Sequence, residues 1–329
     1  MKVHLSCIQD ILKLTKASNI SIMLKDKIYV VANEIKDNEF KGQIVISSDA
    51  ASYEDEGQTL INRDVLKLVP KGTLVTVKED VIVAGNRKIK YPKNDIIHEP
   101  IKVENYLTTI PAGELKHLLS GYYAMSTTLA RPILCGMCIN GSDFIALDGY
   151  RLEVRKGNFE VKEQVVMDLS MVNTLKKIKY DKDVEVYYNY KYVKFKFGDL
   201  EVIGNRLEGN YIKYNQIIPE NCSTSVEIET KPIVDILKDY KKNKFELVKL
   251  NFETNKLIIS ASNEIASIED KVCIKLQGEP LKIAFNVNYL IDALKDYKVA
   301  TLELTARVNP MLIKADNKLD LVLPVRIRD

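Results

Sequence analysis

The chain has 329 residues, of which 46% are hydrophobic, so it is too long for one ordinary core. Its 48 Lys and Arg residues nearly balance its 45 Asp and Glu residues, which excludes a strongly basic tail that holds nucleic acid by charge alone. We therefore predict two or three domains and expect any contact with a polyanion to depend on the local arrangement of charges.

The first third of the chain predicts a helix, strands, a second helix and further strands. Ile8, Ile11, Leu12 and Thr15 form an i, i+3, i+4, i+7 stripe behind Ser6, a candidate cap. We expect strands at 21–32 and 43–48, a helical segment at 60–69 that stops at the turn 70–72, and hairpin strands at 73–83.

The same order then returns twice. After a linker-like stretch at 95–105, a helix starts at 111–114 and carries the stripe Leu115, Leu118, Leu119 and Tyr122. The rest of this round comprises strands at 137–154 and 161–167, a helix at 171–178, and strands at 184–197 and 200–203. The third round comprises a helix from 230, strands at 247–260 and 272–283, a helix at 287–295 and strands at 301–323.

Two sets of landmarks show that these rounds are repeats. The paired anchors of the first helices, Ile11-Leu12, Leu118-Leu119 and Ile236-Leu237, are separated by 107 and 118 residues. The Leu-Lys pairs of the second helices, Leu66-Lys67, Leu175-Lys176 and Leu294-Lys295, are separated by 109 and 119 residues. Matching offsets predict a triplicated α+β domain in which two helices cover antiparallel sheets, with domains at 1–105, 106–222 and 223–329.

One stretch near the middle of the chain stands out. Asp148-Gly149 is the dipeptide that most readily turns a hairpin, and Arg151 follows it between an aromatic residue and a Leu. The tail at 321–327 repeats this combination of apolar residues, a turn residue and an arginine. An ordinary hairpin is the simplest interpretation, and a binding site is the alternative.

Several segments together resemble the bacterial sliding clamp, the β subunit of DNA polymerase III. They are Ala146-Leu147-Asp148-Gly149-Tyr150-Arg151-Leu152, the run at 283–294, the segments at 208–214 and 217–219, Asn309-Pro310-Met311-Leu312-Ile313, and the tail at 323–327. The resemblance covers the second and third domains, whereas the first domain is supported mainly by the repeat. The chain departs from the family pattern at Leu147, Tyr150 and Ile212 and in the extra residues Arg328 and Asp329. It is also shorter than most members and has a divergent first domain, which suits a phage or plasmid relative as well as a chromosomal clamp.

The resemblance implies a processivity factor for DNA replication. Two subunits of three domains each would close head to tail into a homodimeric ring around double-stranded DNA, with helices lining the hole and sheets outside. A pocket between the second and third domains would receive peptides from the DNA polymerase III catalytic subunit, the clamp loader and other clamp-motif proteins. The positions that match its lining are Leu134, Leu147, Gly149, Tyr150, Arg151, Leu152, Ile212, Gln216, Ile217, Asn286, Tyr289, Val308, Pro310, Leu321, Leu323, Pro324, Val325 and Arg326. In such a groove Leu, Ile and Val would bury the apolar anchors of a peptide while Arg151, Arg326 and Asn286 satisfy its polar groups.

Basic residues on every expected helix are candidates for contact with DNA. They are Lys13, Lys16, Arg63, Lys67, Lys116, Lys176, Lys177, Lys238 and Lys295. A lysine on a helix is often only part of a solvated face, but a lysine in all three Leu-Lys pairs would place like charge at equivalent positions around a ring. Contacts of this kind go to phosphates and permit sliding.

Other classes of function have little support. The chain lacks the P-loop, dinucleotide-binding, nucleophile-elbow and zinc-protease motifs, so we predict no enzyme and no cofactor. Five cysteines, an odd count, favour reduced thiols, and Cys135 and Cys138 lack the second ligand pair that a zinc site would need. No run approaches the ~18 apolar residues of a membrane span, which predicts a soluble, cytoplasmic protein. The alternative function is a clamp-fold scaffold that does not close a ring.

Overall fold

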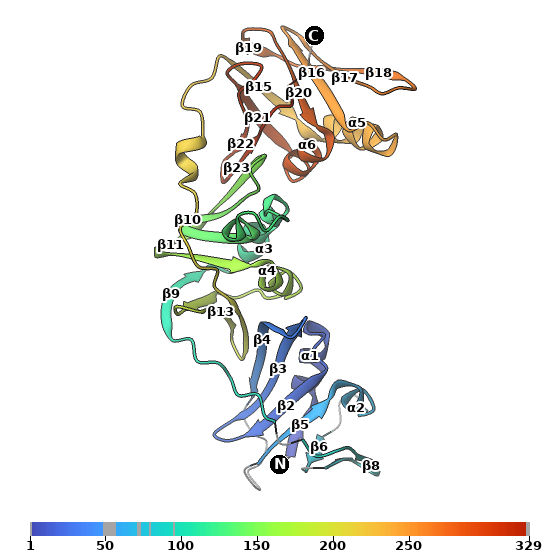
Figure 1. Ribbon diagram of the computed structural model, residues 1–329, viewed down its shortest axis with the longest axis vertical. Helices are drawn as coiled ribbons and strands as arrows, with labels where there is room; N and C mark the ends of the chain where they lie inside the picture. Colours follow the sequence, from blue (N-terminus) through green and yellow to red (C-terminus); the bar gives the residue numbers. More distant parts are fainter. Residues whose placement is uncertain (1, 49–56, 71–73, 79, 95, 327–329) are drawn as a thin grey trace. The chain divides into compact units, whose positions relative to one another are not determined.

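The computed structural model describes residues 2–48, 57–70, 74–78, 80–94 and 96–326 (Figure 1). Its elements are mixed helices and mostly antiparallel strands, which confirms the α+β class. The helices are α1 (Leu5–Leu14), α2 (Arg63–Lys67), α3 (Leu115–Leu118), α4 (Leu169–Leu175), α5 (Thr230–Lys242) and α6 (Val287–Leu294), with 3-10 turns η1 (Leu119–Ala124), η2 (Pro132–Cys135) and η3 (Tyr214–Ile217). The start of the hairpin expected at 73, the linker start at 95, the tail from Ile327 onward and the side chains of Ser6 and Ile8 lie outside what is described.

Each described helix lies where a stripe predicts one, but two differ in extent. The segment expected to be helical from residue 60 is a strand as far as Asn62, whose side chain accepts a hydrogen bond from the backbone N–H of Asp64. A side-chain cap of this kind defines a helix start, so α2 begins at Arg63. The helix expected from 111–114 has one α-helical turn and continues as the 3-10 turn η1.

The strands of the first repeat are β1 (Lys2–His4), β2 (Asn19–Leu24), β3 (Ile28–Lys36), β4 (Glu39–Ser48), β5 (Gly57–Asn62), β6 (Leu74–Val77), β7 (Val81–Ala84) and β8 (Arg87–Lys90). Those of the second are β9 (Asn105–Ile110), β10 (Gly136–Leu147), β11 (Arg151–Asp168), β12 (Val184–Tyr188), β13 (Tyr192–Phe197) and β14 (Leu200–Asn205). Those of the third are β15 (Thr224–Glu229), β16 (Leu247–Glu253), β17 (Lys256–Ser262), β18 (Ser267–Cys273), β19 (Leu276–Gly278), β20 (Leu281–Asn286), β21 (Val299–Leu304), β22 (Met311–Ala315) and β23 (Lys318–Val322). The sequence patterns missed β1, β9 and β15, each of which precedes the first helix of its repeat, and they also missed β8 and nearly all of β18.

Contacts divide the chain into two compact units. One contains Met1–Leu119, Ile139–Ser142 and Asn158–Glu208, and the other contains Ser120–Cys138, Asp143–Gly157 and Gly209–Asp329. We call them unit 1 and unit 2. The three domains with boundaries at 105 and 222 stay a prediction.

The sheets join one repeat to the next. The strand orders are β1-β6-β7-β8, β5-β2-β3-β4-β14-β13-β12-β9, β10-β11-β23-β22-β21-β15-β19 and β18-β17-β16-β20. In both larger sheets the strand that completes a hairpin in one repeat, β4 or β11, pairs antiparallel with the last strand of the next repeat, β14 or β23. In the third repeat the strand equivalent to β4 and β11 is β18, and in the first repeat the strand equivalent to β14 and β23 is β8. Both β18 and β8 lie at the edge of a sheet.

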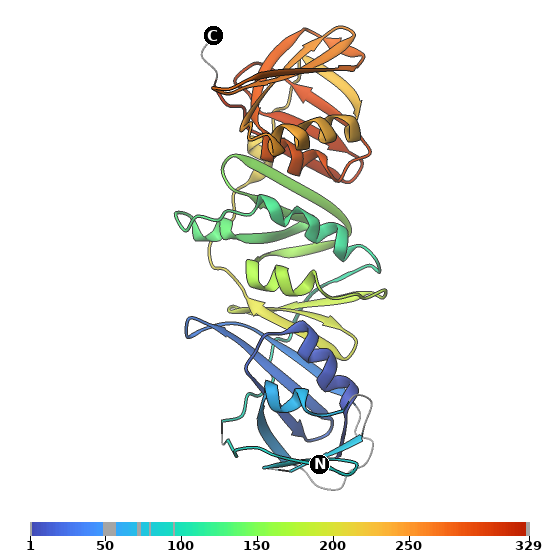
Figure 2. The ribbon, with the colours of Figure 1, turned by 90° about the vertical axis from the view of Figure 1, so that its right-hand side faces the viewer.

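The core of unit 2 shows how the apolar stripes position the helices. Helices α5 and α6 lie side by side over the strands of the third repeat (Figures 1 and 2). Ile233, Leu237 and Tyr240 of α5 and Leu290 and Leu294 of α6 are buried in one cluster with residues of those strands. Because burying one large apolar side chain stabilises a fold by roughly 1.5–3 kcal/mol, this packing holds α6 firmly against the sheet that carries β23.

Candidate functional site

The corner between β10 and β11 is the hairpin turn that the sequence predicts. Gly149 has a φ of 92°, a conformation that side-chain-bearing residues rarely adopt. One carboxylate oxygen of Asp148 accepts hydrogen bonds from the backbone N–H groups of Tyr150 and Arg151, at 2.9 and 3.0 Å. The turn therefore presents Tyr150 and Arg151 in a defined orientation at the start of β11.

The expected meeting of this corner with the tail is confirmed. Strand β11 pairs with β23, so that Arg151 lies opposite Val322. Beyond the strand, the N–H of Leu323 donates to the carbonyl of Tyr150 at 2.8 Å, and the N–H of Val325 donates to the carbonyl of Ala284 at 2.8 Å. The tail thus connects the corner to β20, the strand that leads into α6.

Arg151 is held by partners within unit 2. Its Nε donates to the Asp148 carboxylate at 3.0 Å, and its Nη1 donates to the Asp292 carboxylate of α6 at 2.8 Å. Its guanidinium carbon lies 4.5 Å from the ring centre of Tyr289 and 5.4 Å from that of Tyr123. Only 13% of the Arg151 side chain is exposed. Its main role in this arrangement is therefore to pack against the ring of Tyr289 and hold that ring in position, and direct donation to a ligand is secondary.

The proposed lining divides into an exposed rim and a buried floor. Tyr150 and Leu323 are exposed, Tyr289 is half-buried, and the rings of Tyr150 and Tyr289 lie 6.1 Å apart. Other exposed members are Gly149, Gln216, Ile217, Val308 and Arg326, and partly exposed members are Ile212, Pro310, Pro324 and Val325. Leu134, Leu147, Leu152 and Leu321 are at most 4% exposed, so they form interior packing beneath the rim. All of these residues, and Asn286, belong to unit 2.

Asn286 has a structural task in this arrangement. It is the N-cap of α6, and its side-chain oxygen accepts from the backbone N–H groups of Asn288 and Tyr289. Asn62 and Asp168 cap α2 and α4 in the same way in the other repeats. The cap fixes the first turn of α6 and therefore the position of Tyr289 on the rim.

A buried cluster of charges lies along the β11 and β23 pair. Glu153 is opposite Asp320, and Arg155 is opposite Lys318, with each of the four at most 5% exposed. Arg155 donates from Nε to Glu153 and from Nη2 to Asp296 at 3.0 Å, while Nζ of Lys318 lies 3.2 Å from the Asp320 carboxylate. Burial, together with the charge of Asp320, raises the pKa of Glu153 to about 8, and burial lowers the pKa of Lys318.

Tyrosine hydroxyl groups complete this buried charge cluster. Tyr123 and Tyr297 both donate to the Asp320 carboxylate, the latter at 2.8 Å. The sequence patterns did not single out these residues. A signal was present, because Glu153 and Arg155, like Lys318 and Asp320, occur two residues apart and therefore share one face of a strand, with apolar residues between them.

The candidate DNA-contacting lysines are all exposed, and those of the second helices lie at helix ends. Lys67 ends α2, and Lys176 and Lys295 directly follow α4 and α6, where a positive charge also complements the helix dipole. Lys13, Lys67 and Lys295 each pair with a carboxylate three residues earlier. The remaining candidates Lys16, Lys116, Lys177 and Lys238 are exposed as well.

Arg63 differs from these lysines. It is partly buried, and its guanidinium donates to the carbonyl groups of Leu12 and Thr15. These carbonyls lie at the C-terminal end of α1, where no later turn of helix can pair with them. Arg63 thus ties α2 to α1, which gives it a structural role whether or not it also faces DNA.

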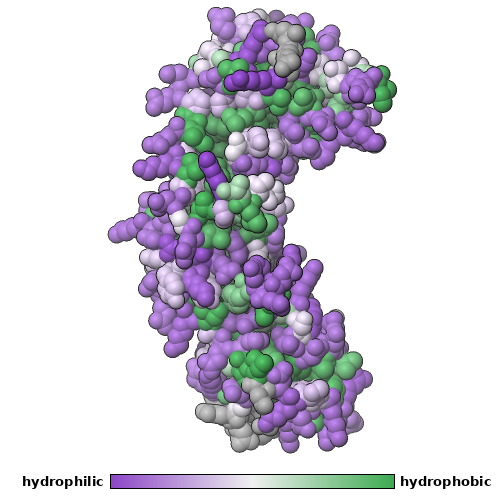
Figure 3. Space-filling model, viewed as in Figure 1, coloured by the Kyte–Doolittle hydropathy of each residue, from purple (hydrophilic) through white to green (hydrophobic). Residues whose placement is uncertain are grey.

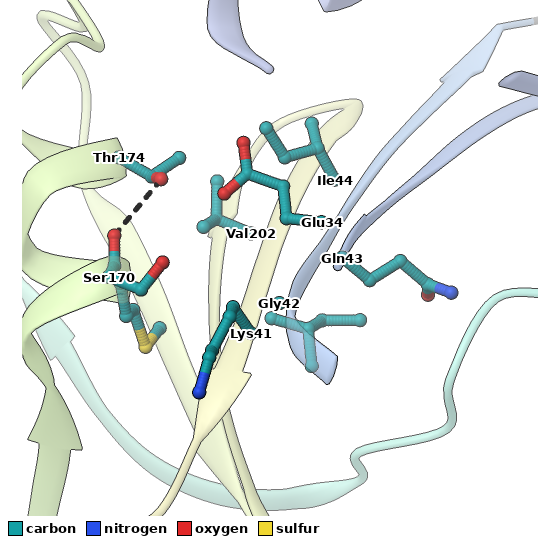
Figure 4. Close-up of a pocket in the computed structure, with 10 residues that line it drawn as sticks. Glu34, Lys41, Gly42, Gln43, Ile44, Ser170, Thr174 and Val202 are labelled. Carbon is teal, nitrogen blue, oxygen red and sulfur yellow. Dashed lines mark hydrogen bonds between the residues drawn. The ribbon is translucent and has the colours of Figure 1, made fainter. Parts of the chain in front are cut away.

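A small cavity and a pair of cysteines are further features of the described residues. A cavity of about 10 Å³ lies where β4, β14 and α4 meet, with Glu34, Lys41 and Thr174 around it (Figure 4), which is room for one water molecule. The thiol of Cys138 is buried with its pKa raised to about 12, while that of Cys135 donates to the carbonyl of Thr128. Among the described residues no cluster has the composition of a metal site, and no helix has the length and apolar character to cross a membrane.

Comparisons with known proteins agree with one another. The family described as "DNA polymerase III beta subunit, C-terminal domain" matches residues 215–325. The beta sliding clamp of Bacillus subtilis (strain 168) is 29% identical over 252 residues, which cover 70% of this chain and 67% of that protein. The beta sliding clamp of Synechococcus elongatus is 26% identical over 322 residues, which cover 86% of this chain and 85% of that protein.

Solved structures give the same fold over the whole chain. The DNA polymerase sliding clamp from Bacillus subtilis superposes with a TM-score of 0.84 at 22% identity, and a putative DNA polymerase III beta subunit from Eubacterium rectale with a TM-score of 0.86 at 19% identity. Each comparison covers 99% of both chains. At these identities the superpositions establish the clamp fold.

Proposed function

We propose that this chain, a member of the bacterial DNA polymerase III β subunit family, is a DNA sliding clamp, a processivity factor that encircles duplex DNA and tethers a replicative polymerase. The observation that carries the proposal is the way one repeat pairs with the next through a shared sheet. This pairing occurs twice, between β4 and β14 and between β11 and β23. The equivalent strands β18 and β8 have no such partner within the described chain and lie at sheet edges. A second copy supplies the missing partner for each edge, so two chains of three repeats close a ring.

The charges of the two edge strands suit such a pairing. Strand β8 carries Arg87, Lys88 and Lys90, all exposed, whereas β18 carries Glu269, Asp270 and Lys271 and is therefore negative on balance. Hydrophilic side chains also cover most of the face drawn in Figure 3, with hydrophobic ones in separate patches. Opposite charge on the two edges favours β8 of one subunit against β18 of its partner over either edge against itself.

The mass in solution tests ring closure. We expect a dimer near twice 37.4 kDa. The variant Lys88→Glu with Lys90→Glu places acidic residues opposite β18 and should weaken the dimer by at least about tenfold, measured by analytical ultracentrifugation. Lys36→Glu, on an interior strand of a sheet, is the control and should leave the dimer intact. A wild-type monomer at micromolar concentration would favour the non-closing scaffold.

In this proposal the rim in unit 2 binds short peptides from the DNA polymerase III catalytic subunit, the clamp loader and other clamp-motif proteins in the cytoplasm. The support is chemical. Tyr150, Tyr289 and Leu323 expose aromatic and apolar surface above a tightly packed floor, which is the composition of an interface hot spot. The proposal includes no catalytic step and no cofactor.

Tyr289→Ala tests the peptide site. The substitution removes one aromatic wall of the rim and should cost about 1–2 kcal/mol in affinity for a peptide that carries a glutamine followed by two spaced apolar residues, measured by fluorescence anisotropy. Tyr190→Ala is the matched control, because Tyr190 is 81% exposed in unit 1. Unchanged affinity in a folded Tyr289→Ala dimer would remove the peptide assignment and leave the ring in place.

A further inference from the structure

Helix α6 brings a residue of the peptide rim and a candidate DNA-contacting lysine close together. Tyr289, Asp292 and Lys295 occur at successive intervals of three residues, a spacing that places them on one face of the helix. Tyr289 belongs to the rim, and Lys295 is exposed directly after the last turn. Asp292 lies between them.

The carboxylate of Asp292 is shared by two cations. One oxygen accepts from Nη1 of Arg151 at 2.8 Å, and the other accepts from Nζ of Lys295 at 2.7 Å. The side chains of Arg151, Asp292 and Lys295 are 13%, 29% and 36% exposed. Each cation therefore draws on the same negative charge, and a change at one alters the interaction with the other.

Tyr123 connects the same two cations a second time. Its ring centre lies 5.4 Å from the guanidinium carbon of Arg151 and 4.8 Å from Nζ of Lys295. The ring cannot easily move, because its hydroxyl group donates to Asp320 in the buried charge cluster. Arg151 in turn stacks 4.5 Å from the ring centre of Tyr289. A continuous set of contacts thus runs from Lys295 to the rim.

We propose that occupancy of the DNA face and occupancy of the peptide rim are energetically linked through Asp292. When a phosphate of duplex DNA engages Lys295, Asp292 keeps Arg151 as its single cation, and the stack of Arg151 on Tyr289 becomes firmer. Peptide then binds to a better organised rim, and by reciprocity bound peptide favours the engagement of Lys295 by phosphate. This inference rests on the proposed function, since it takes Lys295 as a phosphate contact and Tyr289 as a peptide contact.

The expected size of the effect follows from the exposure of the pair. Ion pairs that are partly open to solvent change an equilibrium by a factor of about two to five when they are made or lost. The linkage should therefore alter peptide affinity by about two- to fivefold, and added salt should reduce it.

The first test needs no DNA. Lys295→Met removes the competing cation and should raise the affinity for the fluorescein-labelled peptide by about two- to fivefold. In an Asp292→Asn background the same substitution should have a clearly smaller effect, because the shared carboxylate is gone and only the ring of Tyr123 still connects the two cations. Lys256→Met is the matched control. Lys256 forms a comparable i, i+3 pair with Glu253 at 3.1 Å in the same unit, and its loss should leave peptide affinity unchanged.

The second test adds a short duplex oligonucleotide at low salt. The duplex should raise peptide affinity in the wild type and fail to do so in Asp292→Asn, with folding of each variant checked by circular dichroism. Unchanged peptide affinity in Lys295→Met, or an equal response to duplex in Asp292→Asn, would overturn the linkage. Tyr289→Ala distinguishes failure of the proposed peptide site from failure of the linkage. If Tyr289→Ala leaves peptide affinity intact, the peptide site is misassigned. If Tyr289→Ala loses affinity but Lys295→Met shows no response, the linkage alone is rejected.

Discussion

Once loaded on nicked circular duplex DNA, the protein is expected to stay associated at moderate salt and to run off when the same DNA is cut into a linear form. Lysines at helix ends offer only phosphate contacts, which carry no sequence information and weaken steeply as salt rises. A closed ring is held by topology, so its retention depends on the ends of the DNA and little on salt.

Gel filtration of labelled protein with the DNA, before and after the cut, measures this retention. Linear DNA with both ends blocked by bound streptavidin is the control and should retain the protein, because a ring cannot pass the block. Equal retention on circular and open linear DNA would replace the ring with direct surface binding. Loss from all three forms at moderate salt would support the scaffold alternative.

Breaking the buried charge cluster should produce the largest loss of stability. Arg155 is 2% exposed and pairs with Glu153, which is 1% exposed. Arg155→Met keeps much of the buried volume but, at a pH above about 8 where Glu153 is ionised, leaves the Glu153 carboxylate without its nearest cation. Removal of one partner from a buried pair costs about 3–5 kcal/mol, so the free energy of unfolding of unit 2 should fall by that amount.

Urea unfolding followed by far-ultraviolet circular dichroism measures this loss, since the chain has no Trp to report by fluorescence. Adding Glu153→Gln to Arg155→Met should recover much of the stability, because the stranded charge is then absent. Lys231→Met is the control: its pair with Asp235 is exposed, and its loss should cost under ~1 kcal/mol. A cost for Arg155→Met no larger than that of Lys231→Met would show that the cluster adds nothing to the fold.

Sequence patterns were sufficient to predict the α+β class, the position of each described helix and the corner at Asp148-Gly149, and they also predict a threefold repeat. These features depend on residues that are close in the chain: an apolar stripe has the period of a helix, an alternating run has the period of a strand, and Asp-Gly suits a tight turn. The resemblance to the clamp family depended on local segments of the same kind. Each of these signals can be recognised without knowing which other segments of the chain lie nearby in space.

Strand pairing, the location of buried charge and the contacts of the rim residues became known from the tertiary structure alone. Direct contact between Arg151 and a peptide stays a prediction, and the structure adds that Asp292, 141 residues away, and the rings of Tyr289 and Tyr123 hold Arg151 in place. Strands β1, β9 and β15, which the sequence patterns missed, are held in place by pairing with β6, β12 and β21. Pairing and burial are properties of two segments at once, so a pattern read along one segment does not contain them.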